Sequence, residues 1–156
     1  MTQINIDLLV TCNEGNITID VAKLRPYLSS ARIGSILNSP YAGGPSCAPA
    51  MRTGWSAAEW RQAVKTVQEE ATNLGVPPVL FGLDSIHGAT YVRGAILLPQ
   101  QLSMAAGFDR KAAYKFGFIT ARDTRAAAVP WLFSPILGIS TQAASHILNP
   151  TPTPTR

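Results

Sequence analysis

Short apolar runs and one long helical stripe alternate along the chain. The runs at 33–37, 79–83 and 131–137 have the length and composition of buried strands. A helical stripe precedes the second run, and two further helical segments separate it from the third. This order predicts an α/β fold with a parallel sheet and right-handed crossovers, although periodicity alone does not separate an open doubly wound sheet from a barrel. Residues 3–10 fit either a strand or a helix end.

The clearest helix is predicted from Ser56 to Leu74. Ser56 and Glu59 have the spacing of a capping box, in which each side chain accepts a hydrogen bond from a free backbone N–H at the helix start. Trp55 and Trp60 occupy the two staple positions, and we interpret both as packing residues. The apolar stripe consists of Trp60, Ala63, Val64, Val67, Ala71 and Leu74, with Gly75 as the predicted C-cap.

Capping residues and prolines set the expected bounds of the other helices. Asp20 predicts a short helix that ends before Pro26. A further helix is expected over 99–106, where a proline can occupy the first position. Asp109 predicts the cap of another helix over 110–127.

The stretch from Pro77 to Gly88 carries the main candidate for chemistry. Its apolar run predicts a strand buried on both faces, and Asp84 follows directly after that strand. A carboxylate at the end of a buried strand is costly unless something satisfies it. Parallel α/β folds bind ligands at the carboxyl ends of their strands, so we favour ligand binding for Asp84 over a helix-cap or buried-pair role.

The residues around Asp84 match no common catalytic or metal motif. Asp84, Ser85 and His87 are too close in sequence to converge on one reacting atom as a triad. Asp84 and His87 alone are too few ligands for a metal, and the nearby glycines match no phosphate-binding loop. We therefore expect His87 to hydrogen-bond within the loop, and we expect no cofactor.

The composition limits the function classes. The 156 residues are 46% hydrophobic but only 14% charged, which fits a piece of a larger protein or an oligomer. The net charge of +4 includes no basic run interleaved with aromatics, so we expect no nucleic-acid partner. We expect no membrane span, because no apolar stretch reaches roughly 18 residues. Residues 1–10 lack the basic region of a signal peptide, and the localisation stays open.

The two cysteines, Cys12 and Cys47, show no metal-site spacing. One disulfide and two unrelated thiols are the alternatives, and we favour two unrelated thiols. The redox compartment is therefore not decided by the cysteines.

Several motifs follow one another in a fixed order between residues 79 and 135. They are Phe-Gly-Leu-Asp-Ser-Ile-His-Gly at 81–88, Tyr-Val-Arg-Gly-Ala at 91–95 and Pro-Gln-Gln at 99–101, followed by the segments at 119–126 and 129–135. Together these motifs resemble the N-terminal domain of glycoside hydrolase family 3, the family of β-glucosidases and exo-glucanases. The resemblance extends over residues 1–137 and is most specific between 79 and 135.

The resemblance implies a (β/α)8 TIM-type barrel, of which this chain would hold about the first three strands and their helices. It also implies removal of terminal β-D-glucosyl residues by a retaining mechanism with two carboxylates. The family's motif aspartate binds hydroxyls of the innermost glucose, a role that transfers to Asp84, with His87 and Gly88 structuring the loop. The implied substrates are β-glucosides or β-glucan oligosaccharides, and full-length family members are often secreted or extracellular.

The chain departs from the family pattern after residue 137. Gly138 stands where the family has an aspartate, and no Ser-Asp-Trp-like nucleophile motif or acid/base glutamate is found. Glu59, Glu69 and Glu70, expected on the exposed face or cap of one helix, cannot replace them. We therefore expect a partial barrel domain over 1–138, truncated at both ends, and a divergent, disordered Thr/Pro-rich tail over 139–156.

The resemblance and the missing catalytic motifs leave two hypotheses for the function. The chain is either part of a β-glucosidase-type glycosidase, or a catalytically inactive fragment that serves at best as a weak sugar-binding or interaction piece. Three strands would leave two unpaired edges, so we also expect self-association through those edges.

Overall fold

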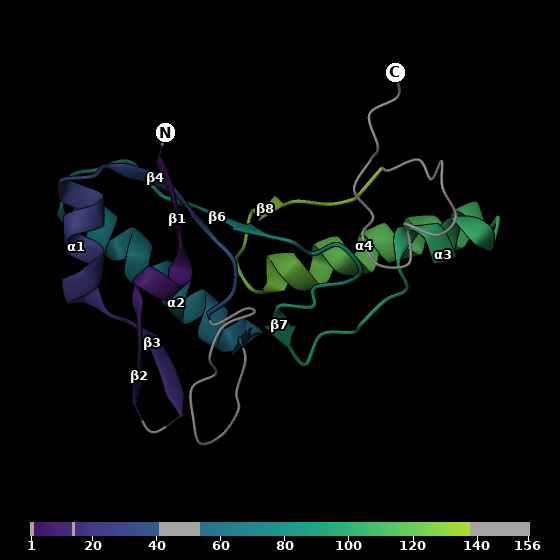
Figure 1. Ribbon diagram of the computed structural model, residues 1–156, viewed down its shortest axis with the longest axis horizontal. Helices are drawn as coiled ribbons and strands as arrows, with labels where there is room; N and C mark the ends of the chain where they lie inside the picture. The colour runs from purple at the N-terminus through teal and green to yellow at the C-terminus, as the bar shows by residue number, and fades with distance from the viewer. Residues whose placement is uncertain (1, 14, 41–53, 138–156) are drawn as a thin grey trace, which may run out of the picture.

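The computed structural model describes residues 2–13, 15–40 and 54–137, and it contains a four-stranded parallel sheet (Figure 1). Its strands lie in the order β1 (Thr2–Asn5), β4 (Ile33–Leu37), β6 (Leu80–Leu83) and β8 (Trp131–Leu132). Two smaller sheets flank it: the antiparallel hairpin of β2 (Val10–Asn13) and β3 (Asn16–Ile19), and the parallel pair of β5 (Trp55–Ser56) and β7 (Val92–Arg93). The expected parallel α/β fold is confirmed.

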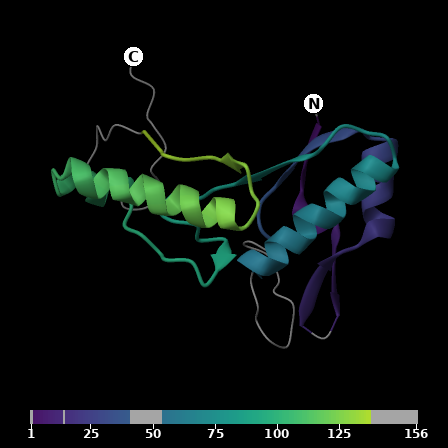
Figure 2. The same ribbon diagram turned by 180° about the vertical axis from the view of Figure 1, so that it is seen from behind.

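Four α-helices and one short 3-10 helix complete the described chain. They are η1 (Ile6–Leu8), α1 (Val21–Ser29), α2 (Ala57–Asn73), α3 (Gln101–Ala106) and α4 (Arg110–Ala126). Figure 2 shows α2 and α4 nearest the viewer, with the strands of the main sheet behind them. The helices α2 and α4 therefore lie on the same side of the sheet. None of the helices in the described ranges is long and apolar enough to cross a membrane.

The two faces of the main sheet differ in how they are covered. Ile36 and Phe81 are paired in register and buried, and the ring of Phe81 packs edge-on against Trp60 of α2, with centroids 6.3 Å apart. Paired residues of parallel strands share a face, so Leu80 belongs with Gly82 on the opposite face. There Leu80 is 43% exposed. The prediction that 79–83 is buried on both faces is therefore wrong for Leu80.

The start of α2 agrees with the prediction in detail. The Ser56 side chain accepts the N–H of Glu59, and the Glu59 carboxylate accepts the N–H of Ser56, which completes the capping box. Trp55 and Trp60 meet edge-to-face with ring centroids 4.9 Å apart. The predicted stripe is buried at Trp60, Ala63, Val67 and Ala71, half-buried at Val64 and 38% exposed at Leu74.

Other helix predictions are confirmed only in part. Asp109 caps α4 as expected, but α1 continues past Pro26 to Ser29. The missing N–H of Pro26 removes one hydrogen bond inside the helix, and burial of Leu28 two residues later favours continuation. In the third apolar run, strand pairing is confined to Trp131–Leu132.

Cys12 is disulfide-bonded, so the expectation of two unrelated thiols is wrong for this residue. It lies in β2, which pairs with β3 in an antiparallel arrangement. Cys47 and the predicted tail at 139–156 lie outside the described residues.

Candidate functional site

Asp84 lies directly after β6, at the carboxyl end of the parallel sheet. It is half-buried and makes no hydrogen bond or ion pair with the described part of the chain. Every other acidic residue in the described ranges has a partner: Asp7, Asp20, Glu59, Glu69, Glu70, Asp109 and Asp123. Asp84 is therefore the one described carboxylate that no protein contact accounts for.

The loop around Asp84 is held by backbone hydrogen bonds on both sides. The N–H of Phe133 donates to the carbonyl of Leu83 at 2.9 Å, and the N–H of Leu98 donates to the carbonyl of His87 at 2.9 Å. The side-chain amide of Gln101 donates to the carbonyl of Ile86. These contacts fix the backbone before and after Asp84 and leave its carboxylate free to meet a ligand.

Gly88 closes this loop at a point that only glycine fits. Its φ is +97°, in the region that L side chains rarely adopt. A Cβ at this position would also collide with the carbonyl oxygen of Ile96 and would lie 3.3 Å from the nitrogen of Leu98. His87 is half-buried, and within the described residues its side chain makes no hydrogen bond. The loop-structuring roles predicted for His87 and Gly88 remain predictions.

Aromatic rings lie on the face of the sheet that continues toward Asp84. Gly82 leaves room for them, because a Cβ there would lie 2.6 Å from the Phe133 ring and 3.4 Å from the Trp131 ring. The rings of Trp131 and Phe133 are 4.7 Å apart and inclined by 64°. We call Leu80, Gly82, Trp131 and Phe133 the open face of the sheet. It presents partly exposed apolar side chains and ends at the unpartnered carboxylate of Asp84.

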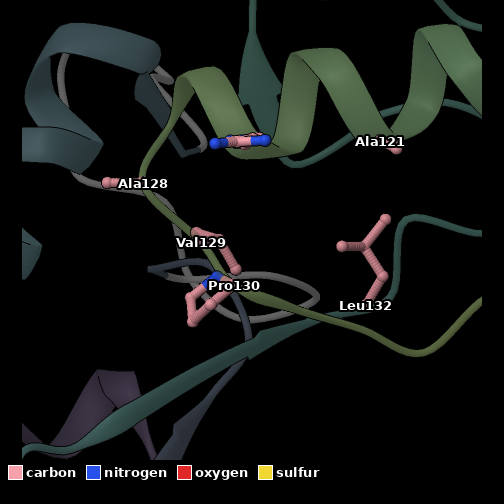
Figure 3. A pocket seen from close by; sticks show the side chains of 6 residues that line it. Ala121, Ala128, Val129, Pro130 and Leu132 are labelled. Carbon is pink, nitrogen blue, oxygen red and sulfur yellow. The ribbon is translucent and has the colours of Figure 1, made fainter.

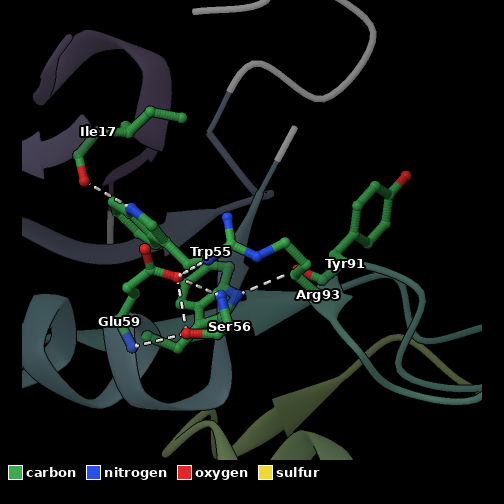
Figure 4. Close-up of polar contacts among 7 residues, drawn as sticks. Ile17, Trp55, Ser56, Glu59, Tyr91 and Arg93 are labelled. Atoms are coloured by element: carbon green, nitrogen blue, oxygen red, sulfur yellow. Dashed lines mark hydrogen bonds and ion pairs between the residues drawn. The ribbon is translucent and has the colours of Figure 1, made fainter. Parts of the chain in front are cut away.

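A polar network fastens the segment after the Asp84 loop to the start of α2 (Figure 4). Arg93 Nη2 lies 2.6 Å from Glu59 Oε2, and the same carboxylate accepts hydrogen bonds from the backbone and side chain of Ser56. Trp60 Nε1 donates to the carbonyl of Tyr91 at 3.0 Å. Partial burial raises the pKa of Glu59, but the hydrogen bonds from Ser56 and the charge of Arg93 outweigh it and hold that pKa below its usual value.

A shallow pocket between the end of α4 and β8 does not include Asp84 (Figure 3). Its lining is apolar apart from one cation and consists of Ala121, Arg125, Ala128, Val129, Pro130 and Leu132. None of the expected site residues contributes to it. The candidate site therefore remains the strand end at Asp84.

Two of the polar contacts that were not predicted from the sequence involve buried side chains. Glu70, expected on the exposed face of α2, is only 7% exposed and accepts a hydrogen bond from Arg25 Nε at 2.6 Å. Ser85 and Thr124 are fully buried, and their hydroxyl oxygens are 2.9 Å apart. Each contact joins residues far apart in sequence, so no local spacing could reveal it.

Comparisons with known proteins agree on one family. Residues 12–149 match the profile of the "Glycosyl hydrolase family 3 N terminal domain". The chain is 38% identical over 145 residues to a lysosomal beta glucosidase of Dictyostelium discoideum. The matched region covers 91% of this chain but only 17% of that protein.

Solved structures give the same result at the level of the fold. An exo-1,3/1,4-beta-glucanase from a Pseudoalteromonas species superposes with a TM-score of 0.62 and 25% identity, over 87% of this chain and 15% of that one. A family 3 beta-N-acetylglucosaminidase from a Paenibacillus species superposes with a TM-score of 0.62 and 18% identity, over 88% of this chain and 23% of that one. This chain thus spans less than a quarter of each relative, and it belongs to glycoside hydrolase family 3.

Proposed function

We propose that this chain forms part of the glucose subsite of a β-glucosidase-type glycoside hydrolase, with Asp84 as the acceptor of sugar hydroxyls. The observation that carries the proposal is the free, half-buried carboxylate of Asp84 at the strand end. A carboxylate accepts two charge-assisted hydrogen bonds from adjacent hydroxyls, and such bonds are about twice as strong as neutral ones. The 38% identity to a beta glucosidase supports glucose as the sugar.

We infer further that the parallel sheet is the beginning of a (β/α)8 barrel. The four strands lie in chain order, and the described helices α2 and α4 cover one face. A doubly wound sheet reverses its strand order and carries helices on both faces, whereas a barrel keeps the order and encloses the other face. The open face would then line the barrel interior, with Asp84 at its carboxyl-end mouth.

Catalysis in the retaining mechanism requires more than Asp84. It uses two carboxyl groups about 5–5.5 Å apart, one as nucleophile and one as acid/base. In the described ranges only Asp84 offers an unpartnered carboxylate. We assign Asp84 to substrate binding, and the second candidate function, a sugar-binding chain without hydrolytic activity, is favoured by this same observation. Incubation with an aryl β-glucoside separates the two, because turnover abolished by Asp84→Ala would exclude the inactive chain.

The hydroxyl-binding role is tested with a deoxy-sugar series. The purified chain is titrated with methyl β-D-glucoside and with its 2-, 3-, 4- and 6-deoxy derivatives, and binding is followed by NMR. Two neighbouring positions should account for most of the affinity, because one carboxylate spans adjacent hydroxyls. An even loss at every position, or none, would contradict the role of Asp84.

A further inference from the structure

We propose that Ser85 and Thr124 form a positioning pair that fixes the direction of the Asp84 carboxylate. The inference rests on the sugar-binding role proposed for Asp84 and assigns a function to a contact between two other side chains. Ser85 follows Asp84 directly, and its Oγ lies 2.9 Å from Thr124 Oγ1. Both residues are 0% exposed, so neither hydroxyl can turn to water instead.

Ser85 continues a buried row that begins in β6. Phe81, Leu83 and Ser85 are all buried, and Phe81 contacts the helix layer through Trp60. Successive side chains of an extended chain point to opposite sides, so Gly82 and Asp84 belong to the other row. Holding Ser85 against α4 therefore turns the Asp84 side chain away from the helices and toward the open face.

The anchor on α4 is itself well fixed. The carbonyl of Thr124 accepts the N–H groups of Ala127 and Val129 at 3.1 and 3.3 Å, where the chain leaves the helix for β8. A hydrogen bond demands a set distance and direction, whereas an apolar pair would tolerate sliding. A buried hydroxyl that loses its partner keeps its desolvation penalty, so both side chains are driven to maintain this geometry.

This contact restrains a side chain where the neighbouring contacts restrain only backbone. The bonds to the carbonyls of Leu83, Ile86 and His87 fix the path of the loop. Within the described residues, the Ser85–Thr124 hydrogen bond is the side-chain anchor adjacent to Asp84. We therefore expect loss of this bond to alter the orientation of Asp84 while the sheet stays intact.

Two substitutions at Thr124 separate a positioning role from a packing role. Thr124→Val keeps the shape and removes the hydroxyl, whereas Thr124→Ser keeps the hydroxyl and removes a methyl group. We expect Thr124→Val to weaken binding of methyl β-D-glucoside about tenfold, and Thr124→Ser to change it less than about twofold. Amide hydrogen exchange of Leu98, whose N–H donates to the carbonyl of His87 in the same loop, should likewise rise about tenfold in Thr124→Val alone.

The outcomes distinguish this inference from the proposed function. The positioning pair would be overturned if Thr124→Val exchanged its amides and bound the sugar as wild type does. It would also be overturned if Thr124→Val and Thr124→Ser lost equal affinity, in proportion to their lower Tm. Asp84→Asn should weaken sugar binding at least about tenfold and leave loop exchange unchanged. If Asp84→Asn binds the sugar as wild type does, the proposed function fails, while the exchange comparison still decides the positioning pair.

Discussion

The carbonyl oxygen of Ile96 occupies the space where a Cβ on Gly88 would lie. The loop that follows Asp84 therefore folds back on itself against backbone, which cannot move aside as a flexible side chain can. Residue 88 also has a φ of +97°, so sterics and backbone conformation both require glycine.

Gly88→Ala should destabilise the chain by at least about 2 kcal/mol, because strained φ and a backbone collision act together. Gly94→Ala is the matched control, since Gly94 has a φ of +88° but no atom within 4 Å of an added Cβ. It should cost about 1 kcal/mol. Urea unfolding measures both changes, and equal losses would contradict the collision.

Arg25→Ala should lower Tm more than any exposed ion-pair substitution, because it leaves the buried Glu70 carboxylate without its partner. We expect a fall of about 6 °C by calorimetry, with most of it recovered in Arg25→Met/Glu70→Leu, where no charge remains buried. Lys65→Ala is the control, since Lys65 and Glu69 form an exposed pair. A fall as large in Lys65→Ala would show that burial of Glu70 is not the cause.

Acid should remove the stabilisation that the ionised Glu59 carboxylate gives to the folded chain. Its pKa is lowered in the folded chain, so the stabilisation is present above the ordinary carboxyl pKa of about 4.3 and is lost as pH falls through the lower folded value. Glu59→Gln keeps an N3 hydrogen-bonding group but not the charge that pairs with Arg93. The Tm difference between wild type and Glu59→Gln should be constant near neutral pH and shrink below pH of about 4. A difference that persists at about pH 2 would exclude the ionised carboxylate as its source.

The open face should drive association of the isolated chain. Leu80 and Trp131 are 43% and 38% exposed there, and they belong to neighbouring regions of one sheet. Sedimentation velocity should show oligomers that increase with protein concentration, and Leu80→Ser should shift the distribution toward monomer. Leu74→Ser is the control, since Leu74 is 38% exposed at the end of α2 instead. A wild-type chain that stays monomeric at high concentration would argue against this expectation.

Local rules predicted most of the elements, and long-range contacts account for what they missed. The bounds of β4, the capping box at Ser56 and the cap at Asp109 depend on neighbours within a few residues, and all three are confirmed. The buried position of Glu70 depends on Arg25, 45 residues away. The end of α1 was misplaced because packing of Leu28 outweighs one hydrogen bond lost at Pro26.

In the candidate site, too, local sequence signals predicted one part and long-range contacts determine the rest. Asp84 could be singled out from sequence because a charge directly after an apolar run is unusual, and motif resemblance indicated the family. The hydrogen bond beside it could not be predicted, because Ser85 and Thr124 are 39 residues apart in sequence. Each of them alone has the pattern of an ordinary polar residue. The lack of any protein partner for Asp84 within the described ranges also required the structure.

The most direct test of the account is a titration of wild type and Asp84→Asn with methyl β-D-glucoside, followed by NMR chemical shifts. Asp109→Asn is the control, because asparagine also caps a helix and the charge change is the same. We predict that Asp84→Asn weakens binding at least about tenfold, with Tm unchanged within about 1 °C, since the carboxylate supports no contact in the described part of the chain. Equal affinity in wild type and Asp84→Asn, or no binding by wild type, would contradict the role assigned to Asp84.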